Sequence, residues 1–256
     1  MSIIITMKRL IPEQNDMELN KIICGDSYKL IKNIPNKSID LIITDPPYEI
    51  GTNCTGGGMA AKKGINNMFK ELKNNSLEVG IREEIFEEFM RVMRRPNIYI
   101  WCNKILIPKL IKFFVLTKGC CFDIISWHKT NAMPLCGGKY LSDTEYCLYF
   151  HKDIKLKTTY ETAKTHYEIP INITDKEFYF HPTIKPLNII KNFILNSSEE
   201  GEIIADFFTG SGTTCVAAKE LNRQYIGIEI SEKWAKIAEN RLSGIDARGQ
   251  IGMFLR

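Results

Sequence analysis

Residues 39–48 read Ile39-Asp40-Leu41-Ile42-Ile43-Thr44-Asp45-Pro46-Pro47-Tyr48. The first six positions are too few and too apolar for a surface helix, and they are typical of a strand buried on both faces of a parallel sheet. Two prolines then end the strand, because proline has no backbone N–H and fixes its own φ. The carbonyl groups of Asp45 and Pro46 therefore leave the ladder beside a carboxylate and an aromatic ring. Two acceptors and a flat ring face suit a planar heterocycle that carries an amino group.

A simpler interpretation of Asp45–Tyr48 is a turn after a strand, since Asp and Pro are ordinary turn formers. A four-residue motif leaves both interpretations open. A second turn, near the other end of the chain, favours the functional one.

This second turn lies in residues 203–214, Ile-Ile-Ala-Asp-Phe-Phe-Thr-Gly-Ser-Gly-Thr-Thr, between an expected strand and an expected helix. Glycine permits close backbone approach, and a helix N-terminus offers N–H groups, so the pattern indicates a nucleotide-type cofactor site. The next strand ends at Glu229, near the acidic position about 20 residues after such a loop that holds ribose hydroxyls. A dinucleotide motif would need glycine at position 215, which is cysteine here. Asp206 and Phe208 instead favour a cofactor with a cationic amino acid end.

Length and composition set the broader limits. The chain has 256 residues, the size of one large α/β domain, and its net charge of +4 is compatible with nucleic acid. Its eight cysteines form no Cys-x-x-Cys pair, and no apolar stretch is long enough for a membrane span. The opening residues also lack a secretory n-region. We therefore expect a cytoplasmic protein with reduced thiols and no metal site.

Patterning along the chain predicts seven strands and six helices. Strands are expected at 20–26, 39–44, 97–101, 121–127, 145–150, 202–206 and 224–229, and helices from Tyr28 to Pro35 and at 81–94, 105–116, 187–195, 212–221 and 232–242. The spacing of 121–127 and 145–150 suits an antiparallel pair at a sheet edge. The glycine-rich residues after Tyr48 predict a mobile loop over 49–80, either a lid or a plain linker. Residues 151–180 are polar and expected to be irregular.

Three motifs occur in a fixed order: Asp45-Pro46-Pro47-Tyr48, His181-Pro182-Thr183-x-Lys185-Pro186 and Asp206-Phe207-Phe208-Thr209-Gly210-Ser211-Gly212. In this order they resemble the motifs of the β-group DNA amino-methyltransferases, over about residues 20–243. The resemblance implies S-adenosylmethionine as cofactor. It also implies a single Rossmann-like α/β domain over 1–256, with a mostly parallel seven-stranded sheet, an antiparallel edge hairpin and the cofactor half after the catalytic half.

The resemblance also implies roles for individual residues. The catalytic motif would be Asp45, Pro46, Pro47 and Tyr48. The cofactor would be held by Asp26, Thr183, Lys185, Asp206, Phe208, Gly210, Gly212, Thr213 and Glu229, with Asp26 near adenine and both Thr183 and Lys185 near the cofactor carboxylate. The target base would lie against Tyr48, Trp127, His128, Lys129 and Asn131. For His128 the alternative is an ordinary half-buried histidine.

The expected substrate is DNA, with the target base flipped out of the duplex and stacked on Tyr48. Adenine N6 is the expected acceptor, because cytosine-N4 members of the family usually carry serine where this chain has Asp45. Cytosine N4, RNA or a small amine remain alternatives, as does a silent nucleic-acid-binding subunit. Recognition of the DNA sequence is expected in an insertion at 131–180, and family habit favours a homodimer.

Overall fold

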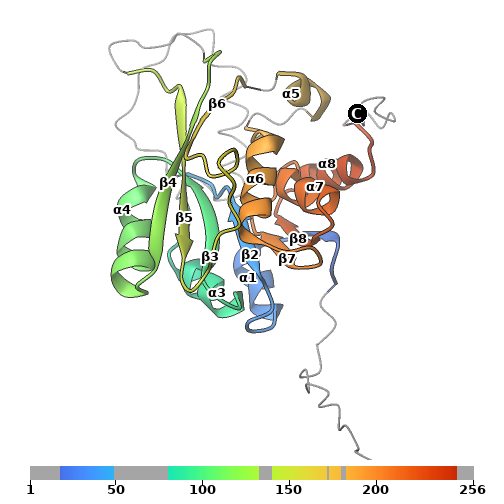
Figure 1. The fold of residues 1–256 in the computed structure, drawn as a ribbon. Helices are drawn as coiled ribbons and strands as arrows, with labels where there is room; N and C mark the ends of the chain where they lie inside the picture. Colours follow the sequence, from blue (N-terminus) through green and yellow to red (C-terminus); the bar gives the residue numbers. More distant parts are fainter. Residues whose placement is uncertain (1–17, 49–79, 133–139, 172, 180–182, 247–256) are drawn as a thin grey trace, which may run out of the picture.

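The computed structural model describes residues 18–48, 80–132, 140–171, 173–179 and 183–246. One sheet runs through these residues, with helices on both of its faces (Figure 1). The strands are β1 (Lys21–Cys24), β2 (Leu41–Thr44), β3 (Asn97–Cys102), β4 (Cys121–His128), β5 (Thr144–His151), β6 (His166–Glu168), β7 (Ile203–Asp206) and β8 (Gln224–Glu229).

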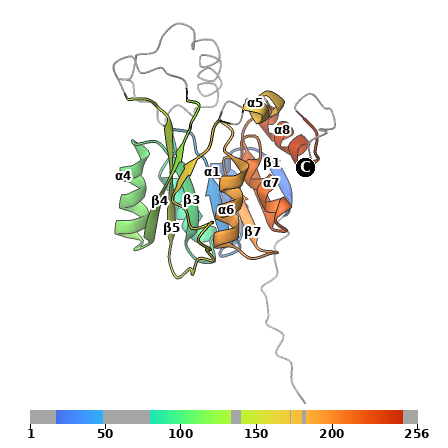
Figure 2. The same ribbon diagram turned by 45° about the horizontal axis from the view of Figure 1, so that its top comes forward.

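The helices form two layers. They are α1 (Ser27–Leu30) with a 3-10 turn (Ile31–Asn33), α3 (Glu84–Val92), α4 (Leu106–Leu110) continued by a π-helix (Ile111–Thr117), α5 (Ile173–Tyr179), α6 (Leu187–Ser197), α7 (Thr213–Glu220) and α8 (Glu232–Leu242). Helices α1, α3 and α4 cover one face, whereas α6, α7 and α8 cover the other (Figure 2). Helix α5 lies beyond the carboxyl ends of the strands, near α8, in both views.

The central strands are apolar on both sides because each face of the sheet is covered. In β2, Ile42 packs into the cluster under α1, α3 and α4, whereas Leu41 and Ile43 pack into the cluster under α6 and α7. Successive side chains of a strand point to opposite faces, so a strand between two helical layers needs an unbroken apolar run. This explains why residues 41–43 are all apolar.

The strand order is β1-β8-β7-β2-β3-β5-β4-β6. β2 runs parallel to β7, with Leu41 beside Ile204 and Ile42 beside Ala205. The strands that precede the two motifs are thus neighbours and end at the same edge of the sheet. Both motifs therefore open at one place, although Thr44 and Asp206 are 162 positions apart in the sequence.

Three sequence predictions need correction. Among the described residues the sheet has eight strands rather than seven, and the antiparallel pair of β4 and β5 is not its edge, because β6 lies parallel to β4 outside the pair. Residues 151–180, expected to be irregular, contain both β6 and α5. In β6 only Tyr167 is buried, between exposed His166 and Glu168, so the strand carries no apolar run that a sequence pattern could reveal.

The other predicted strands and helices are confirmed, with ends shifted by a few residues. The predicted helix over 105–116 is α4 joined to a π-helical segment. The predicted loop over 49–80 lies outside the described residues except for Gly80. In the described part of the chain, no helix is both long and apolar enough to cross a membrane.

Candidate active site

The two motifs are joined by a direct hydrogen bond at the carboxyl edge of the sheet. The hydroxyl of Thr44, the last residue of β2, donates to Oδ1 of Asp206, the last residue of β7, at 2.9 Å. The backbone N–H of Phe208 donates to the same oxygen at 3.1 Å. The carboxylate of Asp206 therefore fixes the start of the glycine turn against the strand that carries Asp45.

Asp206 is buried, and no positively charged side chain among the described residues forms an ion pair with it. Burial raises its pKa to about 7, although hydrogen bonds from Thr214, Phe208 and Thr44 act in the opposite direction. Removing a carboxylate from water penalises its charged form, and hydrogen bonds that favour the charged form compensate only in part. The buried carboxyl group therefore titrates near neutral pH.

The glycine turn closes on Glu229. The N–H of Gly210 donates to one carboxylate oxygen of Glu229 at 2.8 Å, and the N–H of Ser231 donates to the other at 2.9 Å. Gly210 and Gly212 both have positive φ, at 53° and 82°, which glycine adopts without strain. Burial raises the pKa of Glu229 above its ordinary value. The turn thus brings two glycines and a largely buried carboxylate together.

Two more predicted cofactor residues lie beside Glu229. Asp26 follows β1, whose last residue pairs with Glu229, and its side chain accepts the N–H of Tyr28 at 3.0 Å. The ring of Phe208 meets the ring of Tyr28 edge-on, with centroids 6.1 Å apart. Asp26, Phe208 and Glu229 therefore lie near one another at the glycine turn.

Arg241, on α8, was missed by sequence reasoning and anchors the other side of the turn. Its guanidinium donates to the hydroxyl of Thr213 at 2.8 Å, lies 3.5 Å from the carboxylate of Asp175 and sits 4.6 Å from the ring centre of Tyr179. Asp175 and Tyr179 belong to α5. Helix α5 is thus tied to the glycine turn through one buried arginine.

The acceptor motif begins with a half-buried carboxylate. The hydroxyl of Tyr48 donates to Oδ1 of Asp45 at 2.5 Å, and the ammonium of Lys185 contacts Oδ2. Burial, together with the charges of Asp45 and Glu145, raises the pKa of Tyr48 well above its ordinary value, so the phenol keeps its proton. Each oxygen of Asp45 therefore has one protein donor and retains further acceptor capacity.

Lys185 was predicted near the cofactor carboxylate, and its ammonium lies between two protein carboxylates. Beyond Asp45, Nζ is 3.1 Å from Oε2 of Glu145 and 5.1 Å from the ring centre of Trp101. Burial alone would lower the pKa of Lys185, but Asp45 and Glu145 outweigh it and raise the pKa above its usual range. Thr183 is exposed in the turn that precedes it, and His181 and Pro182 of this motif lie outside the described residues.

Glu145 is the second residue that sequence reasoning missed. Its Oε1 is 2.6 Å from Nζ of Lys129, so it lies between two lysines. Burial would raise the pKa of Glu145, but Lys185 and Lys129 lower it to about 2. The signal was available in principle, because β5 is antiparallel to its neighbours and so its first residues, not its last, reach the carboxyl edge.

The residues predicted for the base pocket make different kinds of contact from one another. The indole N–H of Trp127 donates to the carbonyl of Ile169 at 2.7 Å, and the amide of Asn131 pairs with both backbone groups of Ile171. Trp127 and Asn131 thus hold the segment after β6 against β4. His128 is half-buried, 4.0 Å from Asp143, which fits the ordinary histidine of the alternative. Of this set, Tyr48 donates directly to Asp45, and Lys129 is joined to Asp45 through the charged side chains of Glu145 and Lys185.

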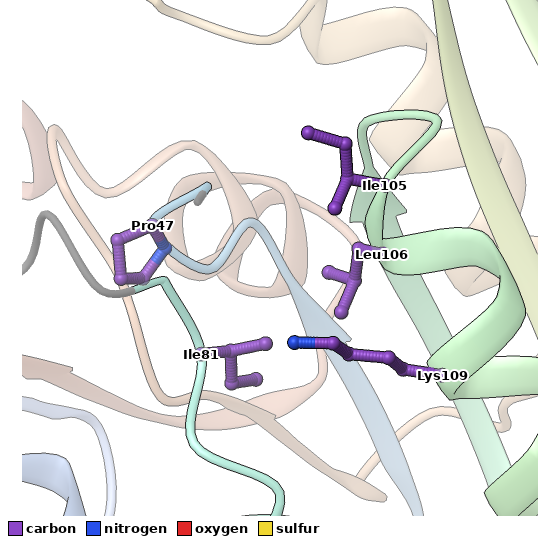
Figure 3. Close-up of a pocket in the computed structure, with 5 residues that line it drawn as sticks. All are labelled: Pro47, Ile81, Ile105, Leu106 and Lys109. Carbon is purple, nitrogen blue, oxygen red and sulfur yellow. The ribbon is translucent and has the colours of Figure 1, made fainter. Parts of the chain in front are cut away.

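A small pocket lies on the other side of the Asp-Pro-Pro-Tyr turn. Its lining consists of Pro47, Ile81, Ile105, Leu106 and Lys109, with the amine of Lys109 directed between the apolar side chains (Figure 3). Four of its five lining residues are apolar, and none carries a carboxylate. This pocket is therefore separate from the polar groups around Asp206. Among the described residues, no cluster of His, Cys, Asp and Glu side chains is arranged to hold a metal ion.

Comparison with known proteins places this geometry in context. The N6_N4_Mtase family model, described as DNA methylase, matches residues 39–240. Type II methyltransferase M2.LlaDCHI of Lactococcus lactis subsp. cremoris is 30% identical over 243 residues, covering 87% of this chain and 88% of that protein. DNA adenine methyltransferase YhdJ of Escherichia coli (strain K12) is 30% identical over 267 residues, covering 90% and 85%. The crystal structure of the M1.HpyAVI-SAM complex aligns with a TM-score of 0.64 and 26% identity, covering 87% and 98%.

Proposed function

The chain belongs to the N6/N4 family of DNA methylases, and from this premise we propose that it transfers a methyl group from S-adenosylmethionine to the exocyclic N6 of adenine in DNA. The observation that carries the proposal is the parallel pairing of β2 with β7, which brings Asp45 and the glycine turn to one edge of the sheet. Ligands of open α/β sheets bind beyond the carboxyl ends of the strands.

The residues around the glycine turn fit this cofactor. A Cβ atom at Gly212 would lie 2.9 Å from Cβ of Ala238, so a larger residue there would force the turn or α8 to shift. We assign Glu229 to the ribose hydroxyls, Asp26 and Phe208 to the adenine, and Asp206 to the amino acid end. When bound, S-adenosylmethionine supplies an electrophilic methyl group on a sulfonium sulfur.

The acceptor motif would activate the target nitrogen. The lone pair of an exocyclic amino group is delocalised into the ring, which makes that nitrogen a poor nucleophile. Hydrogen bonds from the amino group to the Asp45 carboxylate and the Pro46 carbonyl would localise the lone pair on nitrogen. As the nitrogen forms its bond to the methyl carbon, the carbon–sulfur bond of the sulfonium would break with its electron pair left on sulfur, and Asp45 would accept the proton that the nitrogen loses. Positioning and fixed electrostatics of this kind supply most of the acceleration in such sites.

The target base has to leave the duplex to reach Asp45, at a cost of a few kcal/mol. We assign the stacking surface to Tyr48, whose hydroxyl is held by Asp45 and whose ring therefore has a fixed orientation. We further propose that residues 131–180 contribute to DNA sequence recognition, and that the protein acts in the cytoplasm as a homodimer. Light scattering at micromolar concentration tests the dimer.

The proposal is tested with purified protein, labelled cofactor and unmodified genomic DNA, followed by digestion to nucleosides. We expect N6-methyladenine from the wild-type protein; N4-methylcytosine would identify the alternative acceptor. Asp45→Ala should lower turnover by at least about a hundredfold, while calorimetry detects near wild-type cofactor binding. Near wild-type methylation by this variant would refute the mechanism. Cofactor binding by the wild-type protein without methylation of any DNA would refute the proposed activity.

A further inference from the structure

Four charged side chains form a continuous row at the carboxyl edge of the sheet, in the order Lys129, Glu145, Lys185, Asp45. The three successive contacts are 2.6 Å between Lys129 and Glu145, 3.1 Å between Glu145 and Lys185, and the ion pair of Lys185 with Asp45. We call this row the ion chain. It runs from the segment of the predicted base pocket to the acceptor motif, across four separate parts of the sequence.

The inner members of the ion chain are shielded from solvent. The side chain of Lys185 is 7% exposed, and that of Glu145 is 23% exposed. Desolvating a carboxylate and an ammonium is costly, and an apolar pair of similar volume would serve stability at least as well. The charges at these positions therefore point to a task other than stability.

That task follows from the position of Lys185. Its ammonium contacts one oxygen of Asp45, while Tyr48 occupies the other. If Glu145 were absent, Asp45 would be the acidic partner left to Lys185. The ammonium could then move with the Asp45 carboxylate and compete with the incoming amino group for the lone pairs of that carboxylate. Glu145 holds the ammonium from a second side, and Lys129 in turn holds Glu145.

We infer that Glu145 is a positioning residue for the proposed methyl transfer: it fixes Lys185, and through Lys185 it fixes the orientation of the Asp45 carboxylate toward the target amino group. The inference rests on the proposed function. It assigns Glu145 no contact with the cofactor or with the base.

Neighbouring charges make the site sensitive to the loss of Glu145. Lys176 on α5 is coupled electrostatically to the ion chain: burial lowers its pKa, the charges of Lys129 and Lys185 lower it further, and the charge of Glu145 raises it. A neutral residue at position 145 would leave the ammonium groups of Lys129 and Lys185 without the carboxylate that lies between them. Their mutual repulsion would displace Lys185 from its present position.

The test is Glu145→Gln in the full-length protein, which keeps the side-chain size and removes the charge. We expect kcat for DNA methylation to fall at least tenfold while KM for S-adenosylmethionine changes less than threefold. Glu145→Asp, which keeps the charge on a shorter side chain, should recover part of kcat. The matched control is Glu87→Gln on α3, which removes a surface ion pair with Lys118 and should leave both constants unchanged. Wild-type kcat in Glu145→Gln would overturn the inference.

A second readout separates this inference from the proposed function. Acetylation of lysines with acetic anhydride at pH 9, followed by peptide mass spectrometry, should find Lys185 protected in the wild-type protein and at least fivefold more reactive in folded Glu145→Gln. Equal reactivity would show that Glu145 does not hold Lys185 and would also overturn the inference. Absence of DNA methylation by the wild-type protein would instead refute the proposed function, and the acetylation result would still decide whether the ion chain exists.

Discussion

Replacing Gly212 by alanine should destabilise the protein and weaken cofactor binding for a reason that is visible in the backbone. Gly212 has φ of 82° and precedes α7, and an added Cβ would lie 2.9 Å from Cβ and 3.2 Å from Cα of Ala238 on α8. Gly201 provides a matched control, because its φ is 80° and an added Cβ would meet nothing within 4 Å. The two substitutions share the backbone penalty and differ in the clash.

The magnitude follows from these two terms. The left-handed conformation costs an L-residue roughly 1–2 kcal/mol, and this applies to both variants. Forcing a methyl group against the α8 backbone adds about 1–3 kcal/mol, and this applies to Gly212→Ala alone. We therefore expect a loss in unfolding free energy of about 2–5 kcal/mol for Gly212→Ala and about 1–2 kcal/mol for Gly201→Ala, by the same two estimates.

Urea unfolding at 25 °C measures both losses, and calorimetry with S-adenosylmethionine measures the functional consequence. We expect an affinity loss of about tenfold or more, on the order of 1.4 kcal/mol, for Gly212→Ala and no change for Gly201→Ala. Adding Ala238→Gly to Gly212→Ala removes the atom that clashes and should recover about 1 kcal/mol as coupling energy. Equal destabilisation by the two glycine substitutions would refute the close approach of the turn to α8.

Two further predictions concern the buried carboxylates of the turn. The pKa of Asp206 is raised from 3.8 to about 7, so the folded state binds a proton that the unfolded state has lost, and unfolding free energy should fall as pH rises from about 4 to 7. Between pH 5 and 8, urea titrations should show that the unfolding free energy of the wild-type protein falls by about 3 kcal/mol more than that of Asp206→Asn. Parallel plots of unfolding free energy against pH would contradict the raised pKa. Glu229→Gln leaves a single acceptor for the N–H groups of Gly210 and Ser231 and should weaken cofactor binding by about 1–2 kcal/mol in calorimetry, whereas unchanged affinity would contradict its assignment to the site.

Local pattern explains which elements sequence reasoning could find. Some features act within a few residues of chain: the apolar run before Asp45, the two prolines after it and the glycines at 210 and 212. Their structural effects can therefore be predicted from the sequence alone. The strands before both motifs were predicted within a few residues of their observed ends. The short strand β6 was missed because pairing with β4, not its own apolarity, makes it a strand.

Local pattern could not show which side chains of the site contact one another. Lys185 belongs to a recognisable motif, but its contacts with Asp45 and Glu145 join residues 140 and 40 positions away. Glu145 reaches the carboxyl edge only because β5 runs antiparallel to β3. Arg241 likewise meets the glycine turn and α5 only after α8 has packed beside α7.

By itself, then, the sequence determined the motifs, their order and the strands that carry them, since prolines, glycines and β-branched runs restrict the backbone where they stand. The tertiary structure alone decided which charges face one another at the edge of the sheet. The energy of a charge depends on its burial and on neighbours that the fold brings from distant positions, and neither quantity is encoded in local periodicity.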